Sequence, residues 1–162
     1  MNAMKISRLL VAFCLLLVMQ TSAAAVAPDW TLADADGNSV SLSDYKNKPV
    51  ILHFWATWCP YCKKVQPGLD RLYRQHHQQG LEVLGISWWE DEGAEPQKEL
   101  ENRGHRFKTL INGDAVAKKY GVRGTPTTFF IDRNGEIVWV SNTSNPDDPA
   151  LEKAVLRLLN SK

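Results

Sequence analysis

The 162-residue sequence predicts an α/β fold in which helices cover both sides of one mixed β-sheet. Residues 49–55 are an almost continuous apolar run, which is typical of a strand buried on both faces. Residues 58–79 have an amphipathic helical pattern, and residues 81–88 predict a second strand parallel to the first. Residues 127–140 follow the pattern of strand, turn and strand. Together they predict a βαβ unit followed by a hairpin.

Length and composition limit the classes of protein that fit. A chain of this length suits one domain. An apolar fraction of 44% and a charged fraction of 23% exclude disorder, collagen and a multi-spanning membrane protein. The formal net charge of +1 argues against a nucleic-acid partner, because phosphate binding leaves a basic footprint. Three cysteines are too few for a disulfide-stapled scaffold.

Residues 1–25 have the order of side chains that is typical of a secretory signal peptide. Basic residues come before an apolar run at 9–19, and small residues lead to a predicted cleavage after Ala25. The alternative is an uncleaved membrane anchor, but the apolar run is shorter than the ~20 residues that a membrane span needs. We therefore expect an exported, periplasmic protein whose domain covers residues 26–162.

Shorter patterns predict the remaining elements. They are a β-hairpin around 34–38, a helix at about 93–103, a short strand at 107–111 and a helical turn at 114–120. A closing helix begins with Asp148 as its N-cap and Pro149 at its first position. Pro67 lacks an amide hydrogen and is expected to kink the helix of residues 58–79.

Cys59 and Cys62 lie where the buried strand gives way to the helix, and they carry the predicted chemistry. Signal cleavage would remove Cys14 and leave these two as the only cysteines. A helix N-terminus favours negative charge, so we expect a thiolate at Cys59. Cys59, which we expect to be the more exposed, would form a mixed disulfide with a substrate. Cys62, one turn further in, would resolve it.

Other uses of the cysteine pair are open. A static disulfide would close a loop of a few residues and stabilise the fold little. A zinc site needs four ligands, and the sequence has neither a second cysteine pair nor a suitably spaced histidine pair. A copper-binding module would use two thiolates for Cu(I) but lacks a third ligand. Thiol–disulfide exchange without a metal or cofactor is therefore the leading hypothesis.

Two segments and one proline carry a family resemblance. They are residues 54–62 (FWATWCPYC), residues 124–132 (GTPTTFFID) with Gly135, and Pro67 five residues after the second cysteine. In these residues the sequence resembles the thioredoxin superfamily, in particular the exported TlpA/ResA-like thiol–disulfide oxidoreductases. The resemblance extends from Pro28 to the C-terminus. It implies a thioredoxin-like fold in which the N-terminal β-hairpin is an extension, and an activity on protein disulfides.

The resemblance also implies roles for residues around the cysteines. Pro126 is expected to follow a cis peptide bond and to pack against the cysteine pair. The backbone of Thr125 would then pair with an extended substrate segment. Trp58, Pro60 and Tyr61 are expected to contact the substrate.

Two residues are candidates for moving a proton beneath Cys62. His53 stands where the thioredoxin pattern has a buried acid, and it is either a neutral core residue or a proton relay. Glu90 matches the place where the resemblance implies an acid near the resolving cysteine. It is either a proton acceptor or part of a solvated acidic loop. Trp88 and Trp89 either wall the site or pack in the core.

The leading prediction is a monomeric reductant of protein disulfides, such as those of apocytochrome c or of a metal-site assembly factor. A membrane thiol transporter would supply its electrons, because an exported compartment holds no pool that keeps the pair reduced. The alternative is an oxidant that donates its disulfide. Members of this fold differ in reduction potential by on the order of 150 mV, so Pro60 and Tyr61 alone do not decide the direction.

Overall fold

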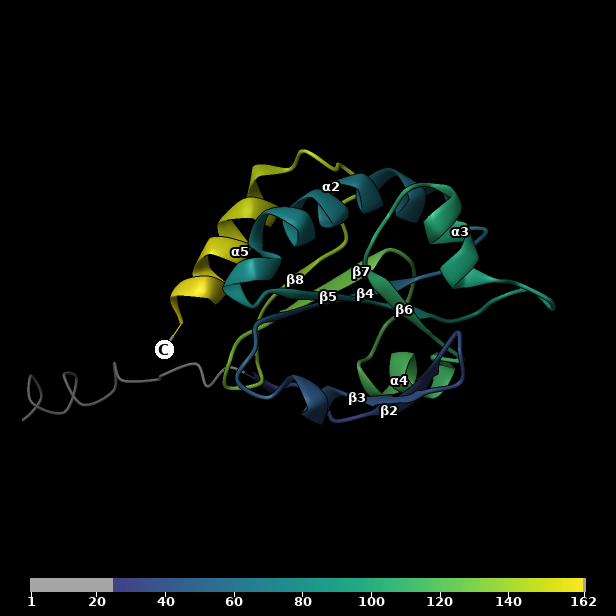
Figure 1. Cartoon of the computed structure of the whole chain (residues 1–162), viewed down its shortest axis with the longest axis horizontal. Helices are drawn as coiled ribbons and strands as arrows, with labels where there is room; N and C mark the ends of the chain where they lie inside the picture. Colours follow the sequence, from purple (N-terminus) through teal and green to yellow (C-terminus); the bar gives the residue numbers. More distant parts are fainter. Residues whose placement is uncertain (1–24, 162) are drawn as a thin grey trace, which may run out of the picture.

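A computed structural model describes residues 25–161, in which helices lie on both sides of a mixed sheet (Figure 1). Within these residues the sheet has eight strands in the order β1-β8-β7-β4-β5-β6-β2-β3. The strands are β1 (Ala25–Val26), β2 (Thr31–Asp34), β3 (Ser39–Ser41), β4 (Val50–Trp55), β5 (Glu82–Ser87), β6 (Lys108–Ile111), β7 (Thr127–Ile131) and β8 (Glu136–Ser141). The predicted α/β fold with a central mixed sheet is confirmed.

The helices cover the two faces unequally. They are α2 (Pro60–His76), α3 (Pro96–Asn102), α4 (Asp114–Lys119) and α5 (Pro149–Asn160), with short 3-10 turns η1 (Leu42–Tyr45) and η2 (His77–Gln79). Helices α2, α3 and α5 lie on one side of the sheet and α4 lies on the other (Figure 1). Within residues 25–161, no helix combines the length and the apolar character that crossing a membrane requires. The predicted signal peptide lies outside the described residues, except for Ala25 in β1.

The central pairing follows the prediction. β4 and β5 are parallel and joined through α2, and β7 pairs antiparallel with both β4 and β8. β2 and β3 pair antiparallel where the sequence predicts a hairpin, and β2 joins the sheet through β6. The ion pair between Lys108 Nζ and Asp34 Oδ2, at 2.9 Å, connects β6 to β2 at this junction. The parallel pair brings the carboxyl ends of β4 and β5 to one edge of the sheet.

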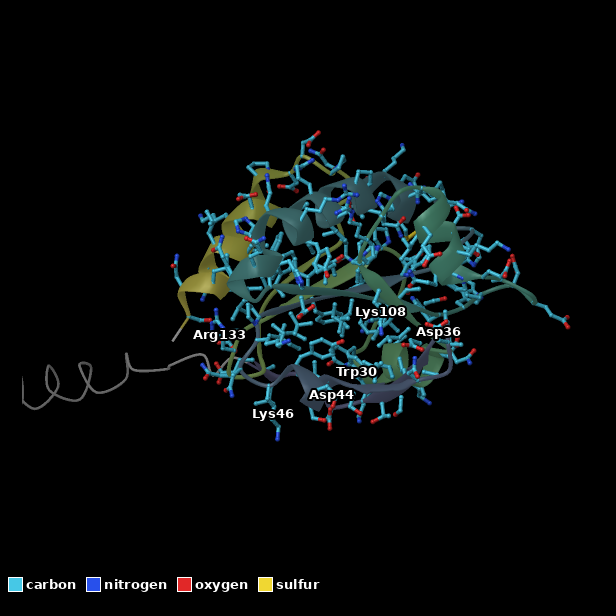
Figure 2. The ribbon with its side chains drawn as sticks, viewed as in Figure 1. Trp30, Asp36, Asp44, Lys46, Lys108 and Arg133 are labelled. Atoms are coloured by element: carbon cyan, nitrogen blue, oxygen red, sulfur yellow. A yellow bond between two sulfur atoms is a disulfide. The ribbon has the colours of Figure 1, made fainter. Side chains whose placement is uncertain are left out.

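Two apolar layers explain why every residue of β4 is buried. Ile51 and Trp55 belong to the layer between the sheet and helices α2 and α5. Leu52 and Phe54 point the other way, into a layer that also contains Trp30 (Figure 2). A strand buried on both faces needs apolar residues at successive positions, and that is the pattern from which it was predicted.

The helix boundaries differ slightly from the predictions. Helix α2 begins at Pro60 instead of residue 58 and continues through Pro67 to His76, and Gly80 follows the next 3-10 turn in a left-handed conformation. Helix α3 is shorter than predicted, because Gly93 has a φ of 79° and Pro96 occupies the first turn. The predicted N-cap of α5 is confirmed, since the Asp148 carboxylate accepts a hydrogen bond from Ala150 N at 2.9 Å.

Candidate active site

The cysteine pair lies at the carboxyl end of β4. Cys59 is the N-cap of α2 and forms a disulfide with Cys62, whose Cα atom is 5.4 Å away. The backbone N–H of Cys62 donates a hydrogen bond to Cys59 Sγ, with an N–S distance of 3.1 Å. This donor belongs to the first turn of the helix, where free N–H groups favour negative charge. The same donor would stabilise a thiolate on Cys59 after reduction of the disulfide.

Both cysteines are buried in this disulfide-bonded state, so the greater exposure expected of Cys59 stays a prediction for the reduced protein. Cys59 is 1% exposed and Cys62 is fully buried, and both belong to the apolar layer beneath α2. The disulfide explains the burial, since it turns the Cys59 sulfur inward towards a sulfur that lies in the core. Access of another sulfur to Cys59 therefore requires movement of the neighbouring side chains.

The peptide bond between Thr125 and Pro126 is cis, as the resemblance implies. β7 begins directly after it, with Thr127 paired to Phe54, so Pro126 lies beside the end of β4. Pro126 is buried and Thr125 is half-buried. The side chain of Asn142 holds this turn, because its Nδ2 atom donates to Pro126 O at 3.0 Å.

Glu90 is bound to the turn that precedes the cysteine pair. Its carboxylate accepts hydrogen bonds from Thr57 N at 3.0 Å, from Thr57 Oγ1 at 2.6 Å and from Ser87 Oγ at 2.6 Å. Ser87 ends β5, so Glu90 ties the end of this strand to the turn that follows β4. The geometry gives Glu90 a positioning role, and its predicted role as a proton acceptor remains a prediction.

His53 has the environment of a core residue. It is fully buried, and its Nδ1 atom lies 2.9 Å from Thr128 Oγ1. Its Nε2 atom is buried and has no hydrogen-bond partner among the described residues. Burial lowers the pKa of His53 to about 3, so the ring is neutral at neutral pH. These observations favour the neutral core residue over the proton relay.

Exposed aromatic side chains are next to the buried cysteines in the chain or contact Trp58, the residue before Cys59. The exposed fractions are 42% for Trp58, 57% for Tyr61 and 61% for Trp89. The rings of Trp58 and Trp89 pack edge to face with centroids 5.1 Å apart, and Trp58 Nε1 donates to Trp89 O at 2.7 Å. Trp88 instead packs against the apolar layer on the far side of the sheet. Of the two alternatives that the sequence left open, Trp88 therefore packs in the core and Trp89 lies at the site.

The contact between Trp58 and Trp89 was not expected from the sequence. The signal available was a pair of tryptophans directly after a strand that runs parallel to β4. Strand ends that meet at one edge bring such residues close to the cysteine turn. The pairing of the side chains depends on the backbone of Trp89, which no sequence pattern predicts.

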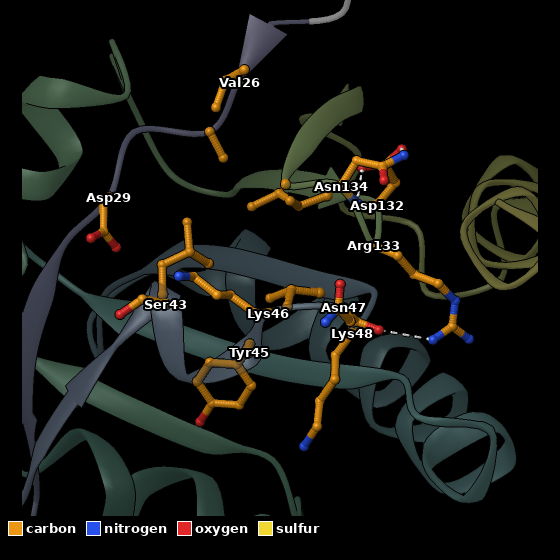
Figure 3. A pocket seen from close by; sticks show the side chains of 15 residues that line it. Val26, Asp29, Ser43, Tyr45, Lys46, Asn47, Lys48, Asp132, Arg133 and Asn134 are labelled. Atoms are coloured by element: carbon orange, nitrogen blue, oxygen red, sulfur yellow. Dashed lines mark hydrogen bonds between the residues drawn. The ribbon is translucent and has the colours of Figure 1, made fainter. Parts of the chain in front are cut away.

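Two other features bear on ligand binding. No group of three or more histidine, cysteine, aspartate or glutamate side chains in residues 25–161 is arranged to hold a metal ion. At the opposite end of the strands, an open groove of about 530 Å³ is lined by residues that include Val26, Lys46, Asn47 and Asp132 (Figure 3). Arg133 crosses its end and donates to Asn47 O at 3.0 Å (Figure 3). The sequence had given no indication of this groove.

A family model described as "AhpC/TSA family" matches residues 23–140, which is most of the chain. The chain belongs to the AhpC/TSA family. Two curated relatives are named thiol-disulfide oxidoreductase ResA. The protein from Geobacillus thermodenitrificans is 39% identical over 114 residues, and the one from Bacillus subtilis is 36% identical over 115 residues. Each alignment covers 70% of this chain but only 65% and 64% of the respective relative.

Solved structures support the same placement of this AhpC/TSA family member. A crystal structure from Chlorobium tepidum, described as a DsbE-type thiol:disulfide interchange protein, has a TM-score of 0.76 and 31% identity. The similarity covers 85% of this chain and 97% of that one. A thiol:disulfide interchange protein from Bacteroides sp. has a TM-score of 0.69 and 29% identity, over 82% and 90% of the two chains. The predicted thioredoxin-like fold and ResA-like resemblance are confirmed.

Proposed function

We propose that this AhpC/TSA family member is an exported thiol–disulfide oxidoreductase that acts on protein disulfides through Cys59 and Cys62. The observation that carries the proposal is the disulfide at the N-terminus of α2, with the N–H of Cys62 directed at Cys59 Sγ. The names of the relatives add support. Export rests on the predicted signal peptide at residues 1–25.

The exchange proceeds in two balanced steps. In the reduced protein, the Cys59 thiolate attacks one sulfur of a substrate disulfide, the substrate S–S bond breaks, and the other substrate sulfur leaves as a thiolate. Cys62, as a thiolate, then attacks Cys59 Sγ. This attack re-forms the Cys59–Cys62 disulfide and releases the second substrate sulfur. Two electrons have passed to the substrate, whose thiolates take protons from water.

Neighbouring residues have supporting roles in this proposal. Thr125 is half-buried, and in this proposal its backbone would pair with an extended substrate segment, while Pro126 contributes no N–H that could compete for that segment. Trp58, Pro60 and Tyr61 are exposed around the cysteine pair and would contact the substrate. Glu90 would hold the turn at Thr57 in place while the sulfurs exchange.

We propose reduction of substrates as the physiological direction. Pro60 occupies the first position of α2 and has no amide hydrogen, so the helix N-terminus offers one donor fewer to a thiolate on Cys59. The carboxylate of Glu90 is fixed at Thr57, two residues before Cys59. Both features limit the stabilisation of the reduced form, and a less stabilised reduced form gives a lower reduction potential.

The proposed partners follow from this direction. Substrates would be protein disulfides, such as those formed in cytochrome c maturation or metal-site assembly, and the protein would act as a monomer. The pair ends each cycle oxidised, so a second dithiol must return two electrons. A membrane thiol transporter is the proposed source.

An insulin-reduction assay with dithiothreitol as electron donor tests the proposal. The purified protein should accelerate insulin precipitation, and Cys59→Ser should abolish the acceleration because the attacking thiol at the N-cap of α2 is lost and Cys62 alone cannot complete the two-step exchange. Absence of acceleration by the wild type would refute the exchange activity. Equilibration with glutathione then tests the direction. A reduction potential nearer to about −270 mV than to about −120 mV supports a reductant, and the reverse supports an oxidant.

A further inference from the structure

Trp89 has a backbone conformation that its side chain does not favour. Its φ is 55°, in the left-handed region. Among the described residues, the other non-glycine residues with positive φ are Asn47 and Asn112. Asparagine tolerates this region because its short amide can hydrogen-bond locally, whereas a bulky aromatic residue there is an outlier. Such outliers cost stability and concentrate at functional sites.

Three residues fasten this conformation to the active site. Trp89 N donates to Asp114 Oδ1 at 3.2 Å, and Trp89 O accepts from Trp58 Nε1 at 2.7 Å. The next residue, Glu90, binds Thr57. The backbone of Trp89 is therefore held from α4 on one side and from the residue before Cys59 on the other.

Burial does not explain this arrangement. The side chain of Trp89 is 61% exposed and that of Trp58 is 42% exposed, although tryptophan usually buries much of its large apolar surface. The edge-to-face geometry, with an interplanar angle of 85°, presents apolar ring surface to solvent beside the cysteine turn. A tryptophan with a strained backbone and an exposed ring contributes little to the stability of the fold. We therefore infer that Trp89 serves binding.

The surface beside Trp89 is acidic. Asp114, which holds Trp89, also lines a groove of about 460 Å³ together with Glu90, Asp91 and Glu92. Asp91 and Glu92 are exposed and make no salt bridge within residues 25–161. A partner that lies along this groove would be favoured by positive charge.

We propose that Trp58 and Trp89 form an aromatic shelf that selects substrate polypeptides with an aromatic or large aliphatic side chain and a lysine or arginine beside the reactive cysteine. The shelf binds the apolar side chain, and the acidic groove binds the basic one. This inference rests on the proposed exchange function and names the substrate class for it. The shelf acts on substrate binding, so its contribution belongs in KM.

Four disulfide probes test the shelf. Three are disulfide-bonded peptides with Phe and Lys, Ser and Lys, or Phe and Glu beside the cysteine, and the fourth is hydroxyethyl disulfide. For the wild type, we expect the Phe peptide to have a KM about three- to tenfold lower than that of the Ser peptide, as expected for one aromatic contact. The third peptide, with Glu in place of Lys, should bind more weakly than the Phe–Lys peptide.

Trp89→Asn is the decisive variant, because asparagine suits the left-handed backbone and removes the ring. It should fold at least as stably as the wild type and lose the preference for Phe over Ser through KM. Trp89→Phe should restore most of the preference. Leu156→Asn removes another exposed apolar side chain, on α5, and should leave the preference unchanged.

The outcomes separate the shelf from the exchange activity. If the wild type exchanges none of the probes, the proposed function fails. If it exchanges hydroxyethyl disulfide and treats the Phe and Ser peptides alike, the exchange activity stands and the shelf is refuted. Retention of the full preference in Trp89→Asn would also refute the shelf.

Discussion

Each end of the sheet has a left-handed backbone residue whose carbonyl accepts a side-chain hydrogen bond, but the two residues differ in type. Before β4, at the amino end, Asn47 has a φ of 63° and its carbonyl accepts from Arg133. After β5, at the carboxyl end, Trp89 has a φ of 55° and its carbonyl accepts from Trp58. Asparagine suits this conformation and tryptophan does not. The departure from local preference therefore lies at the end that carries the cysteines, which is where function would require it.

This contrast between the two ends would not hold if a residue inside β4, such as His53, took part in proton transfer. The largest expected effect is therefore the pH dependence of stability that comes from His53. Its pKa is about 3 in the fold and about 6.5 in an unfolded chain. Below pH 6.5, His53 binds a proton in the unfolded state but stays neutral in the folded state. The free energy of unfolding should therefore fall by about 1.4 kcal/mol per pH unit from this residue, between pH 6.5 and about 3.

Urea denaturation at pH 7.5 and pH 5.0 measures this effect in the wild type and in His53→Asn, whose amide can still pair with Thr128. The loss of stability between the two pH values should be about 2 kcal/mol larger in the wild type. His105, whose pKa burial also lowers, is present in both proteins and cancels in the difference. Equal losses of stability in the two proteins would mean that His53 is protonated in the folded state at pH 5.0, and they would favour the proton relay over the neutral core residue.

The next test concerns how firmly the carboxyl end is held. Glu90→Ala should lower the free energy of unfolding by about 2 kcal/mol, because it leaves Thr57 and Ser87 donors without their acceptor. Glu92→Ala, in the same acidic segment but exposed, should change it by no more than about 0.5 kcal/mol. Chemical denaturation of both variants decides. Equal small effects would show that Glu90 belongs to a solvated loop.

The smallest expected effect comes from exchanging the residue types at Asn47 and Trp89, two of the residues with a left-handed φ. Trp89→Asn should raise the free energy of unfolding by up to about 1 kcal/mol, because asparagine relieves the backbone strain. Asn47→Trp should lower it by a similar amount at the amino end. Thermal unfolding of both variants provides the measurement. Destabilisation by Trp89→Asn would show that the exposed ring stabilises the fold. Trp89 would then no longer be a residue retained at a cost in stability.

Much of the fold could be predicted from the sequence because the signals were local. The apolar run of β4, the amphipathic stripe of α2 and the Asp148–Pro149 start of α5 each specify one element. The start of α3 was less predictable, because Gly93 has a left-handed φ of 79° and the helix begins only at Pro96.

The candidate site was predictable in its residues but not in its contacts. The spacing of Cys59 and Cys62 places them on one helical turn, which the structure bears out. The equal burial of the two sulfurs depends on the disulfide itself, and the hydrogen bonds of Glu90 depend on the register of β4 and β5. The contact of Trp58 with Trp89 joins residues 31 positions apart through a conformation that sequence patterns do not encode.

In the proposed exchange, Cys59 captures the substrate and Cys62 releases it, although the two are almost equally buried in the disulfide. Reduced Cys62→Ser incubated with disulfide-bonded insulin, followed by intact-mass and peptide mass spectrometry, measures these roles. We expect a persistent adduct attached to position 59, because no second thiol remains to displace it, and a markedly weaker adduct on Cys62 in the matched Cys59→Ser protein. An adduct that forms readily on Cys62 alone, with position 59 unmodified, would reverse the two roles and refute the proposed exchange.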